Sequence, residues 1–387
     1  MQNQRLKGLD GLRALAALAV FAVHYNQIVD VDVQYGEFDF YLLFANGEMG
    51  VALFFVLSGL LLSLPYWRAI LFKEAWPKLS TFVKHRLARI LPAYYMALTL
   101  LIILSNYWVF PAAWPDILLH YSFLFNYSEF SFFSINPSFW TLAVEMQFYL
   151  LLPIFFVVLR YQSFARALGL LVILALVCYA LHYMFVLAVD KNIPWPGSTI
   201  LLWVKVNGAV VTQSLLAHLP HFIIGIITGG VLLKTKTHLA FTQNSGAGQV
   251  KLVCDVVFVL SLSTVILLMA TELGEWIQIP MGRYGLPVLP LVLAVLVYVT
   301  PFTYYAKWVL DDVVVRHLGK VSYGIYIYHF PILSFVDYQM SIYGWDARED
   351  WAYLLIIASL LIFIVANLSY YLVERPILGY AHKQRVN

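Results

Sequence analysis

The sequence predicts an all-α protein, a polytopic membrane helix bundle of about ten transmembrane helices with both termini in the cytoplasm. Of its 387 residues, 62% are hydrophobic and only 12% are charged, and the mean hydropathy is +0.79. A soluble domain carries roughly 25% charged residues. Apolar runs of about 20 residues recur along the whole chain, and each is long enough to cross a bilayer as a helix. The distribution of Lys and Arg residues then distinguishes the two sides of the membrane.

The predicted spans follow the apolar runs in order along the chain. They cover residues 11–29, 48–66, 90–108, 139–159, 167–188, 211–233, 252–271, 285–305, 321–341 and 352–373. With these spans, all but four of the 24 Lys and Arg residues fall on the side of the termini, the exceptions being Lys191, Lys205, Arg283 and Arg348. Cytoplasmic loops carry an excess of Lys and Arg, so the termini are expected inside. A nine- or eleven-helix arrangement would remove this asymmetry.

The first apolar segment is expected to remain in the protein as a membrane helix. Arg5 and Lys7 precede an Ala/Leu run, as in a signal peptide. However, Asp10, Arg13 and His24 interrupt the pattern, and a second apolar segment follows soon after. A retained signal-anchor helix explains these residues better.

Arg13 and His24 share one face of this helix, because their spacing is close to three full turns. They are about 16 Å apart along the axis, which places Arg13 near the membrane boundary and His24 well inside. Ionisable groups inside a membrane are costly and indicate function, and histidine transfers protons near neutral pH. The alternatives are that Arg13 anchors the helix end and that a neighbouring helix satisfies His24.

A second polar position lies inside the predicted span 139–159. Glu145 and Gln147 interrupt an otherwise apolar run. A glutamate in lipid is protonated or paired, and His24 is the expected partner, since a carboxylate beside an imidazole supports a general base. The alternative is a structural hydrogen bond between helices.

Two further clusters are polar. Arg86 and Arg89 are three residues apart, so they share a helix face, and their guanidinium groups suit phosphate oxygens. The alternative is a positive-inside anchor. Near the end of the chain, Tyr323, Tyr326 and His329 recur every third residue and form a polar stripe on a membrane helix, followed by Pro331.

Other classes of site are not supported. Cys178 and Cys254 lie in separate apolar segments without metal-type spacing, so neither a disulfide framework nor a zinc site is expected. No basic tail or motif indicates nucleic-acid binding. The predicted outer loops are acidic and aromatic, which suits carbohydrate or an interfacial aromatic belt. The chain is expected to be a single integral-membrane domain, residues 1–387, with no appended soluble domain.

The order of these segments resembles the acyltransferase-3 family of integral-membrane O-acyltransferases. The resemblance begins with the arginine, ten-residue gap and histidine signature formed by Arg13 and His24. The other matching segments are residues 50–59, 86–92, 140–149, 322–331 and 374–376. Six matches in the same order make the resemblance specific. Thr141 stands where a serine is usual, and the extracellular esterase-like domain of some members is absent, so this membrane domain would complete the transfer unaided.

The resemblance implies a membrane-bound O-acyltransferase that takes an acyl group, most often acetyl, from cytoplasmic acetyl-CoA. The acceptor would be a hydroxyl of a cell-envelope polysaccharide or a lipid-linked sugar on the outer side of a bacterial inner membrane. Arg13, Arg86 and Arg89 would bind the donor, and His24, oriented by Glu145, would act as general base or acyl carrier. Trp140 and the stripe of Tyr323, Tyr326 and His329 would support the substrate or the structure.

Other functions remain open at this stage. Intramembrane His and Glu also build proton relays, so a proton-coupled transporter is the main alternative. A transporter would be favoured by inverted repeats or paired broken helices, and neither is clear here. Within the family, transfer of succinyl or a longer chain is possible, as is a non-catalytic sensor or assembly factor. The sequence does not separate direct transfer from a two-step reaction.

Overall fold

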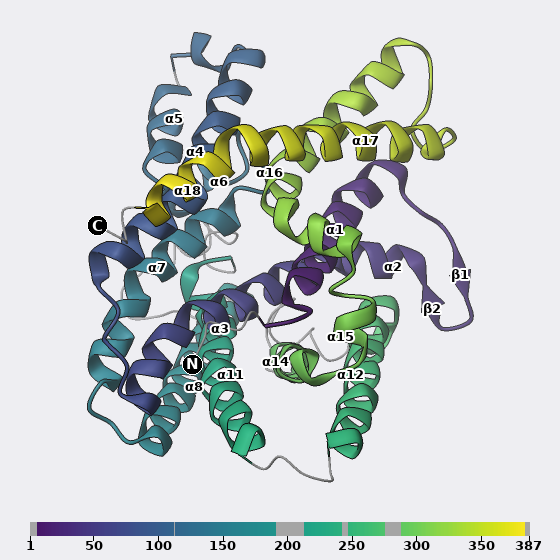
Figure 1. Cartoon of the computed structure of the whole chain (residues 1–387). Coiled ribbons are helices and arrows are strands. Elements are labelled where there is room, and N and C mark those ends of the chain that lie inside the picture. Colours follow the sequence, from purple (N-terminus) through teal and green to yellow (C-terminus); the bar gives the residue numbers. More distant parts are fainter. Residues whose placement is uncertain (1–5, 112, 191–212, 242–246, 275–287, 384–387) are drawn as a thin grey trace.

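The computed structural model describes residues 6–111, 113–190, 213–241, 247–274 and 288–383, and in these it is almost entirely helical (Figure 1). Within these residues, each of the ten predicted spans overlaps a helix. Lys191, Lys205 and Arg283, which entered the charge argument, lie outside the described residues, as do the first residues of the spans 211–233 and 285–305.

The ten helices that match predicted spans form the body of the protein. They are α1 (Leu9–Val29), α3 (Met49–Phe72), α4 (Leu79–Leu104), α7 (Trp140–Leu159), α8 (Phe164–Asp190), α11 (Leu215–Phe241), α12 (Ala247–Ala270), α14 (Val288–Val299), α16 (Val313–Ile342) and α17 (Trp351–Ser369). Eight of the described helical segments are long and apolar enough to cross a membrane. Of the other two helices, α14 is short, and α16 is long but carries polar residues such as His329 and Asp337. The fold is therefore the predicted polytopic helix bundle.

Short elements connect the long helices. Two strands of two residues each, β1 (Gln34–Tyr35) and β2 (Phe38–Asp39), form a hairpin. The hairpin leads into α2 (Phe40–Ala45) and η1 (Asn46–Glu48). Between α4 and α7 the chain forms η2 (Tyr107–Val109), α5 (Ala113–Tyr121), η3 (Phe125–Tyr127) and α6 (Glu129–Phe132). Before α16 come η5 (Thr300–Phe302) and α15 (Tyr305–Trp308), and after α17 a π-helical turn, η6 (Tyr370–Glu374), continues into α18 (Arg375–Lys383).

Helix α4 begins well before the predicted span. It starts at Leu79 and not near residue 90, so the basic stretch before Ile90 is part of the helix. Arg86 and Arg89 therefore lie within a continuous helix, one turn apart. Helix α16 likewise starts at Val313 and continues without interruption through Pro331. Tyr323, Tyr326 and His329 thus occupy successive turns of one helix.

Glycines allow the central helices to approach closely. A Cβ atom added to Gly59 of α3 would collide with the carbonyl oxygen of Phe222 in α11, and one added to Gly225 of α11 would collide with that of Val56. The indole Nε1 of Trp67 donates to the Ile226 carbonyl oxygen at 2.8 Å across the same contact. Small residues at such crossings are typical of membrane helix packing. The contact holds α3 in place, and α3 supplies one wall of the cavity described below.

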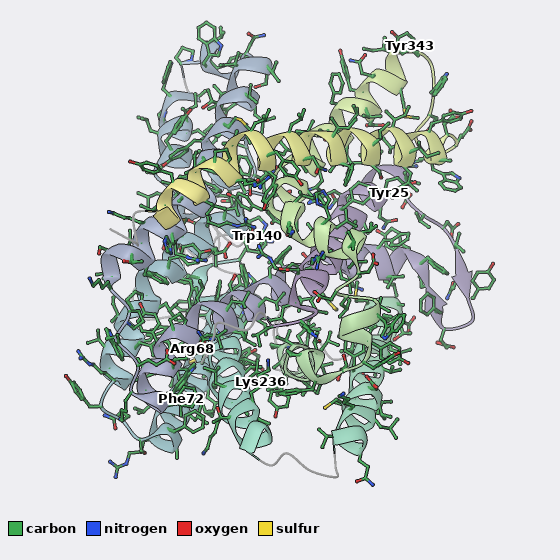
Figure 2. All side chains as sticks on the ribbon, viewed as in Figure 1. Tyr25, Arg68, Phe72, Trp140, Lys236 and Tyr343 are labelled. Carbon is green, nitrogen blue, oxygen red and sulfur yellow. The ribbon has the colours of Figure 1, made fainter. Side chains whose placement is uncertain are left out.

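Labelled residues mark the two ends of the bundle. Arg68 of α3 and Lys236 of α11 lie at one end, and Tyr343, just after α16, lies at the opposite end (Figure 2). The sequence places the first two residues in the cytoplasm and the third outside. The arrangement agrees with the expected orientation, which stays a prediction.

Candidate functional site

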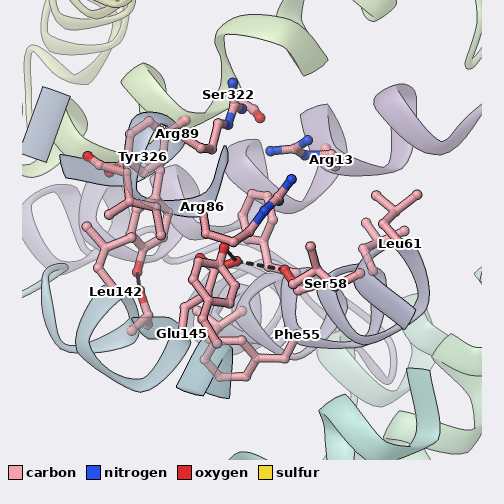
Figure 3. A pocket seen from close by; sticks show the side chains of 18 residues that line it. Arg13, Phe55, Ser58, Leu61, Arg86, Arg89, Leu142, Glu145, Ser322 and Tyr326 are labelled. Carbon is pink, nitrogen blue, oxygen red and sulfur yellow. Dashed lines mark hydrogen bonds between the residues drawn. The ribbon is translucent and has the colours of Figure 1, made fainter. Parts of the chain in front are cut away.

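A cavity lies among α1, α3, α4, α7 and α16, with about 800 Å³ of empty space that includes open solvent (Figure 3). Apolar side chains form much of its wall, and the polar lining is unusually rich in charge for a membrane helix bundle. The lining residues that carry charge or a hydroxyl group are Arg13, Ser58, Arg86, Arg89, Thr141, Glu145, Tyr149, Ser322, Tyr323 and Tyr326.

Three arginines converge on this cavity. Arg13 comes from α1, and Arg86 and Arg89 come from successive turns of α4 (Figure 3). The guanidinium of Arg86 lies 6.0 Å from the ring centre of Tyr149, and that of Arg89 lies 5.6 Å from the ring centre of Tyr323. The structure therefore brings together the three arginines that the sequence singled out. Like charges gather in this way where an anion is to be bound.

Two carboxylates balance part of this charge. Glu145 lines the cavity, and Glu374, fully buried in the π-helical turn η6, lies behind the wall. The Nη1 atom of Arg89 is 3.5 Å from Oε2 of Glu374. Asp10, on α1 near Arg13, is a third acid that interacts with these guanidinium groups.

Glu145 has different partners from those expected. Its Oε1 accepts hydrogen bonds from the hydroxyl groups of Ser58, at 2.8 Å, and Tyr149, at 2.6 Å. Among the described residues, the direct hydrogen bond between Glu145 and His24 that the sequence suggested does not form. The packing of α7 against α3 and α4 turns the carboxylate toward the arginine cavity, away from the histidine. The sequence analysis did not predict Ser58 and Tyr149 as partners. Tyr149 lies one turn after Glu145, so the i, i+4 spacing could have predicted this contact.

His24 lies outside the lining of the arginine cavity and belongs to a second polar group. Its Nδ1 is 2.9 Å from Oε1 of Gln27, one turn further along α1. Its ring centre is 5.1 Å from that of His329 and 5.0 Å from that of Phe330, both on α16. The sequence did not foresee a histidine pair, because nothing in the spacing of α1 and α16 fixes how the two helices meet.

The stripe on α16 joins the two polar groups. The Tyr323 hydroxyl donates to the Ile90 carbonyl oxygen of α4 at 2.8 Å, beside Arg89. One turn on, the Tyr326 hydroxyl donates to the Ser138 carbonyl oxygen at 2.9 Å. A further turn on, His329 lies beside His24. The stripe therefore runs from the arginines to the histidine pair, over about 9 Å at 1.5 Å per residue.

Trp140 is placed elsewhere. It begins α7 and is largely buried, but it does not line the cavity. Its ring is 5.2 Å from that of His218 on α11 and 6.2 Å from that of Phe132 on α6. It thus packs the amino-terminal end of α7 against two neighbouring elements.

Metal and disulfide chemistry find no support in the described ranges. No group of three or more His, Cys, Asp or Glu side chains within them is arranged to hold a metal ion. Both cysteines are free thiols, with Cys178 buried and Cys254 partly buried.

Comparison with known proteins places the chain in a family. The model of the family described as "Acyltransferase domain" matches residues 6–371, nearly the whole chain. The chain belongs to this acyltransferase family. The match confirms the resemblance carried by Arg13, His24 and the segments that follow them. The protein is thus a multi-pass bacterial membrane protein of the acyltransferase family, and membership favours acyl transfer over the transporter alternative.

Curated relatives within the acyltransferase family have low sequence identity to this chain, but the similarity extends over nearly all of it. The peptidoglycan O-acetyltransferase OatA of Listeria monocytogenes is 28% identical over 95% of this chain and 55% of its own length. A putative O-acetyltransferase of Staphylococcus aureus strain COL is 28% identical over 96% of the chain and 57% of its own length, and the O-acetyltransferase OatA of strain NCTC 8325 is 25% identical over similar shares. This acyltransferase therefore spans little more than half the length of these relatives. No solved structure matches.

Proposed function

We propose that this protein is a membrane O-acetyltransferase that moves an acyl group from acyl-CoA, most often acetyl-CoA, to a hydroxyl of a cell-envelope glycan or lipid-linked sugar. The observation that carries the proposal is the convergence of Arg13, Arg86 and Arg89 on one cavity in a chain of the acyltransferase family. The names of the relatives support acetyl as the group and a glycan such as peptidoglycan as the acceptor.

The arginine cavity suits the charged part of the donor. Arginine forks bind phosphate oxygens through paired N–H groups, and a low-dielectric wall strengthens each contact. The Nε of Arg86 is buried and has no hydrogen-bond partner among the described residues, so it is available to a ligand. Pyrophosphate bound here would leave the thioester arm free to follow the α16 stripe toward the histidine pair.

His24 is the proposed general base. Oε1 of Gln27 only accepts hydrogen bonds, so Nδ1 of His24 carries a proton and Nε2 keeps its lone pair. His24 is only partly buried, whereas His329 is fully buried, so an acceptor would meet His24 first. With the predicted orientation, that acceptor arrives from the outer side. Glu145 would set the charge of the arginine cavity and would not orient His24.

The test uses purified protein in nanodiscs and measures acetyl-CoA binding and CoA release. Arg13→Ala should weaken binding by about 10-fold to 100-fold, the loss of one or two charge-assisted hydrogen bonds. His24→Ala should keep binding and lose sustained turnover by about 100-fold or more. Arg166→Ala, at an exposed arginine in the first turn of α8, is the matched control and should leave both values unchanged.

Two outcomes of this binding experiment would change the proposed donor. If the wild-type protein binds acetyl-CoA poorly but binds succinyl-CoA or a longer acyl-CoA, the donor assignment moves within the family. If it binds and cleaves none of these thioesters, acyl-CoA is not the donor.

A further inference from the structure

Ser138 is a buried serine that lies directly beside a buried histidine. It occurs two residues before α7 and is 2% exposed, and its Oγ is 3.4 Å from Nε2 of His329, which is fully buried. A hydroxyl with an imidazole nitrogen within reach is the arrangement that activates a serine as a nucleophile. Neither residue lines the arginine cavity.

The protonation state of His329 suits this role. Its Nδ1 lies 2.7 Å from the carbonyl oxygen of Tyr326 and 3.2 Å from that of Ile325. Carbonyl oxygens only accept hydrogen bonds, so Nδ1 carries the ring proton and Nε2 presents its lone pair to Ser138. Backbone carbonyls of α16 thus fix the tautomer of this histidine, as a carboxylate does in the serine hydrolases.

Ser138 lies immediately behind the wall of the arginine cavity. Its carbonyl oxygen accepts hydrogen bonds from Tyr326 and Thr141, and both of these residues line the cavity. Their hydroxyl groups are 2.6 Å apart, which closes the wall at this point. A thioester that extends along the cavity from the arginines would reach Ser138 once this pair separates.

The local backbone holds Ser138 in register with α16. Its N–H donates to Oδ1 of Asn136 at 3.0 Å, and Nδ2 of Asn136 donates to the Ile327 carbonyl oxygen at 3.1 Å. Ser138 also precedes the first turn of a 20-residue helix, whose amino end carries a partial positive charge. That charge favours the oxyanion that forms when a hydroxyl near it attacks a carbonyl.

We propose that Ser138 carries the acyl group as a covalent ester between donor and acceptor, with His329 as the base that charges it and His24 as the base that discharges it. The proposal rests on the function proposed above and divides it into two steps. The ring centres of His24 and His329 are 5.1 Å apart, so the base proposed for the second step is adjacent to the base proposed for the first.

In the first step, Oγ of Ser138 attacks the thioester carbonyl carbon and its proton moves to Nε2 of His329. The C–S bond breaks, and the CoA sulfur takes that proton and leaves as the thiol. In the second step, the acceptor hydroxyl gives its proton to Nε2 of His24 and attacks the ester carbonyl carbon. The bond to Ser138 Oγ breaks, the new ester leaves on the acceptor, and the proton on His24 returns to the serine oxygen.

The burial of Ser138 is consistent with a carrier. An ester exposed to water would be hydrolysed before an acceptor arrived, and a site 2% exposed keeps water out. A direct transfer would need donor and acceptor at His24 together, yet His24 is absent from the lining of the donor cavity. The serine bridges the two polar groups that the structure keeps apart.

The experiment uses the full chain in nanodiscs with radiolabelled acetyl-CoA and no acceptor, followed by peptide mass spectrometry. His24→Ala should release one equivalent of CoA in a burst and retain one acetyl group on the peptide containing Ser138. That label should resist neutral hydroxylamine, as an oxygen ester does. Ser138→Ala and His329→Ala in the His24→Ala background should abolish both burst and label. Ser63→Ala, a buried serine on α3 that bonds only to its own helix, is the matched control and should keep them.

Ser138→Cys gives a result that is not expected if Ser138 has only a structural role. The label should move to the new thiol and become sensitive to hydroxylamine, because it is then a thioester. In otherwise wild-type protein, Ser138→Ala should lower transfer to an acceptor by about 100-fold or more while acetyl-CoA binding is retained.

Three results would overturn the carrier. They are full transfer by Ser138→Ala, a hydroxylamine-sensitive label on His24 of the wild-type chain, and the absence of a burst and label in His24→Ala. With wild-type turnover intact, these results leave the acyltransferase function standing. If the wild-type chain releases no CoA from any acyl-CoA, both proposals fail together.

Discussion

Nη1 of Arg89 and Oε2 of Glu374 lie 3.5 Å apart, and this ion pair joins α4 to the π-helical turn after α17. The glutamate is fully buried and the arginine is 18% exposed. A π-helical turn is rare and occurs most often at functional sites. Here it carries into the bundle the carboxylate that holds one of the three cavity arginines in place.

Replacing Glu374 by Gln should therefore weaken donor binding. The amide keeps the shape but removes the charge, so Arg89 loses its fixed partner and samples more conformations. We expect the KM for acetyl-CoA to rise by about 3-fold to 10-fold, equivalent to about 1 kcal/mol, with a smaller change in kcat. Glu74→Gln, the same change at an exposed position, should leave KM unchanged. An unchanged KM in Glu374→Gln would show that the ion pair does not position Arg89.

Glu145 offers a test between the sequence-based and structure-based assignments. Its carboxylate contacts Ser58 and Tyr149, and the amide of Glu145→Gln can still accept both hydrogen bonds through Oε1. We expect acetyl-CoA to bind equally well or a few-fold more tightly, since a negative charge leaves a cavity that binds an anion. The pH profile of turnover should not move, because Glu145 does not contact His24.

The measurement is kcat against pH for wild type, Glu145→Gln and the exposed control Glu129→Gln. A profile displaced only in Glu145→Gln would restore Glu145 as the partner that sets the proton affinity of His24.

The contrast between these residues shows which features the sequence can predict. Arg13 and His24 share one helix, and so do Tyr323, Tyr326 and His329, so 3.6-residue periodicity predicts their common faces. Arg86 and Arg89 follow from the same rule. The structure gathers the three arginines around one cavity and places His24 and His329 in a second polar group.

Contacts between helices could not be predicted in this way. Hydropathy predicts that α3 and α7 are membrane helices, but it does not predict how each helix is rotated about its own axis. That rotation determines that Glu145 accepts a hydrogen bond from Ser58 and not from His24. The pairing of His24 with His329 depends on the crossing of α1 and α16. Ser138 lies in the short segment before α7, where no helical period applies, so its contact with His329 is visible only in three dimensions.

The contact between α3 and α11 should be intolerant of added volume. In Gly59→Ala or Gly225→Ala, the new Cβ would meet the backbone carbonyl of Phe222 or Val56, and the helices would have to separate. We expect each change to destabilise the protein by about 1–3 kcal/mol, read as a lower Tm in detergent. Gly169→Ala on α8 faces open space and should be neutral or slightly stabilising. Equal Tm values for all three variants would contradict the close approach.

The connection between α4 and α7 should lose stability in acid through Asp116. This residue and His120 are both buried on α5, with His120 Nδ1 3.1 Å from Asp116 Oδ1, and the Tyr107 hydroxyl donates to Oδ2 at 2.8 Å. Burial raises the pKa of Asp116, but hydrogen bonds from His120, Ser134 and Ser131 outweigh it and hold the pKa below its usual range.

A carboxyl with a lowered pKa in the folded state stabilises the fold only while it is ionised. The stabilisation is complete above the unfolded pKa of about 3.9 and disappears as the pH falls through the folded pKa. Asp116→Asn should therefore lower Tm at pH 7, and the difference from wild type should shrink as the pH is lowered from about 4 to 3. Asp32→Asn, at an exposed position in the connection after α1, should differ little from wild type at any pH. A Tm difference for Asp116→Asn that stays constant down to pH 3 would mean that its ionised form contributes nothing.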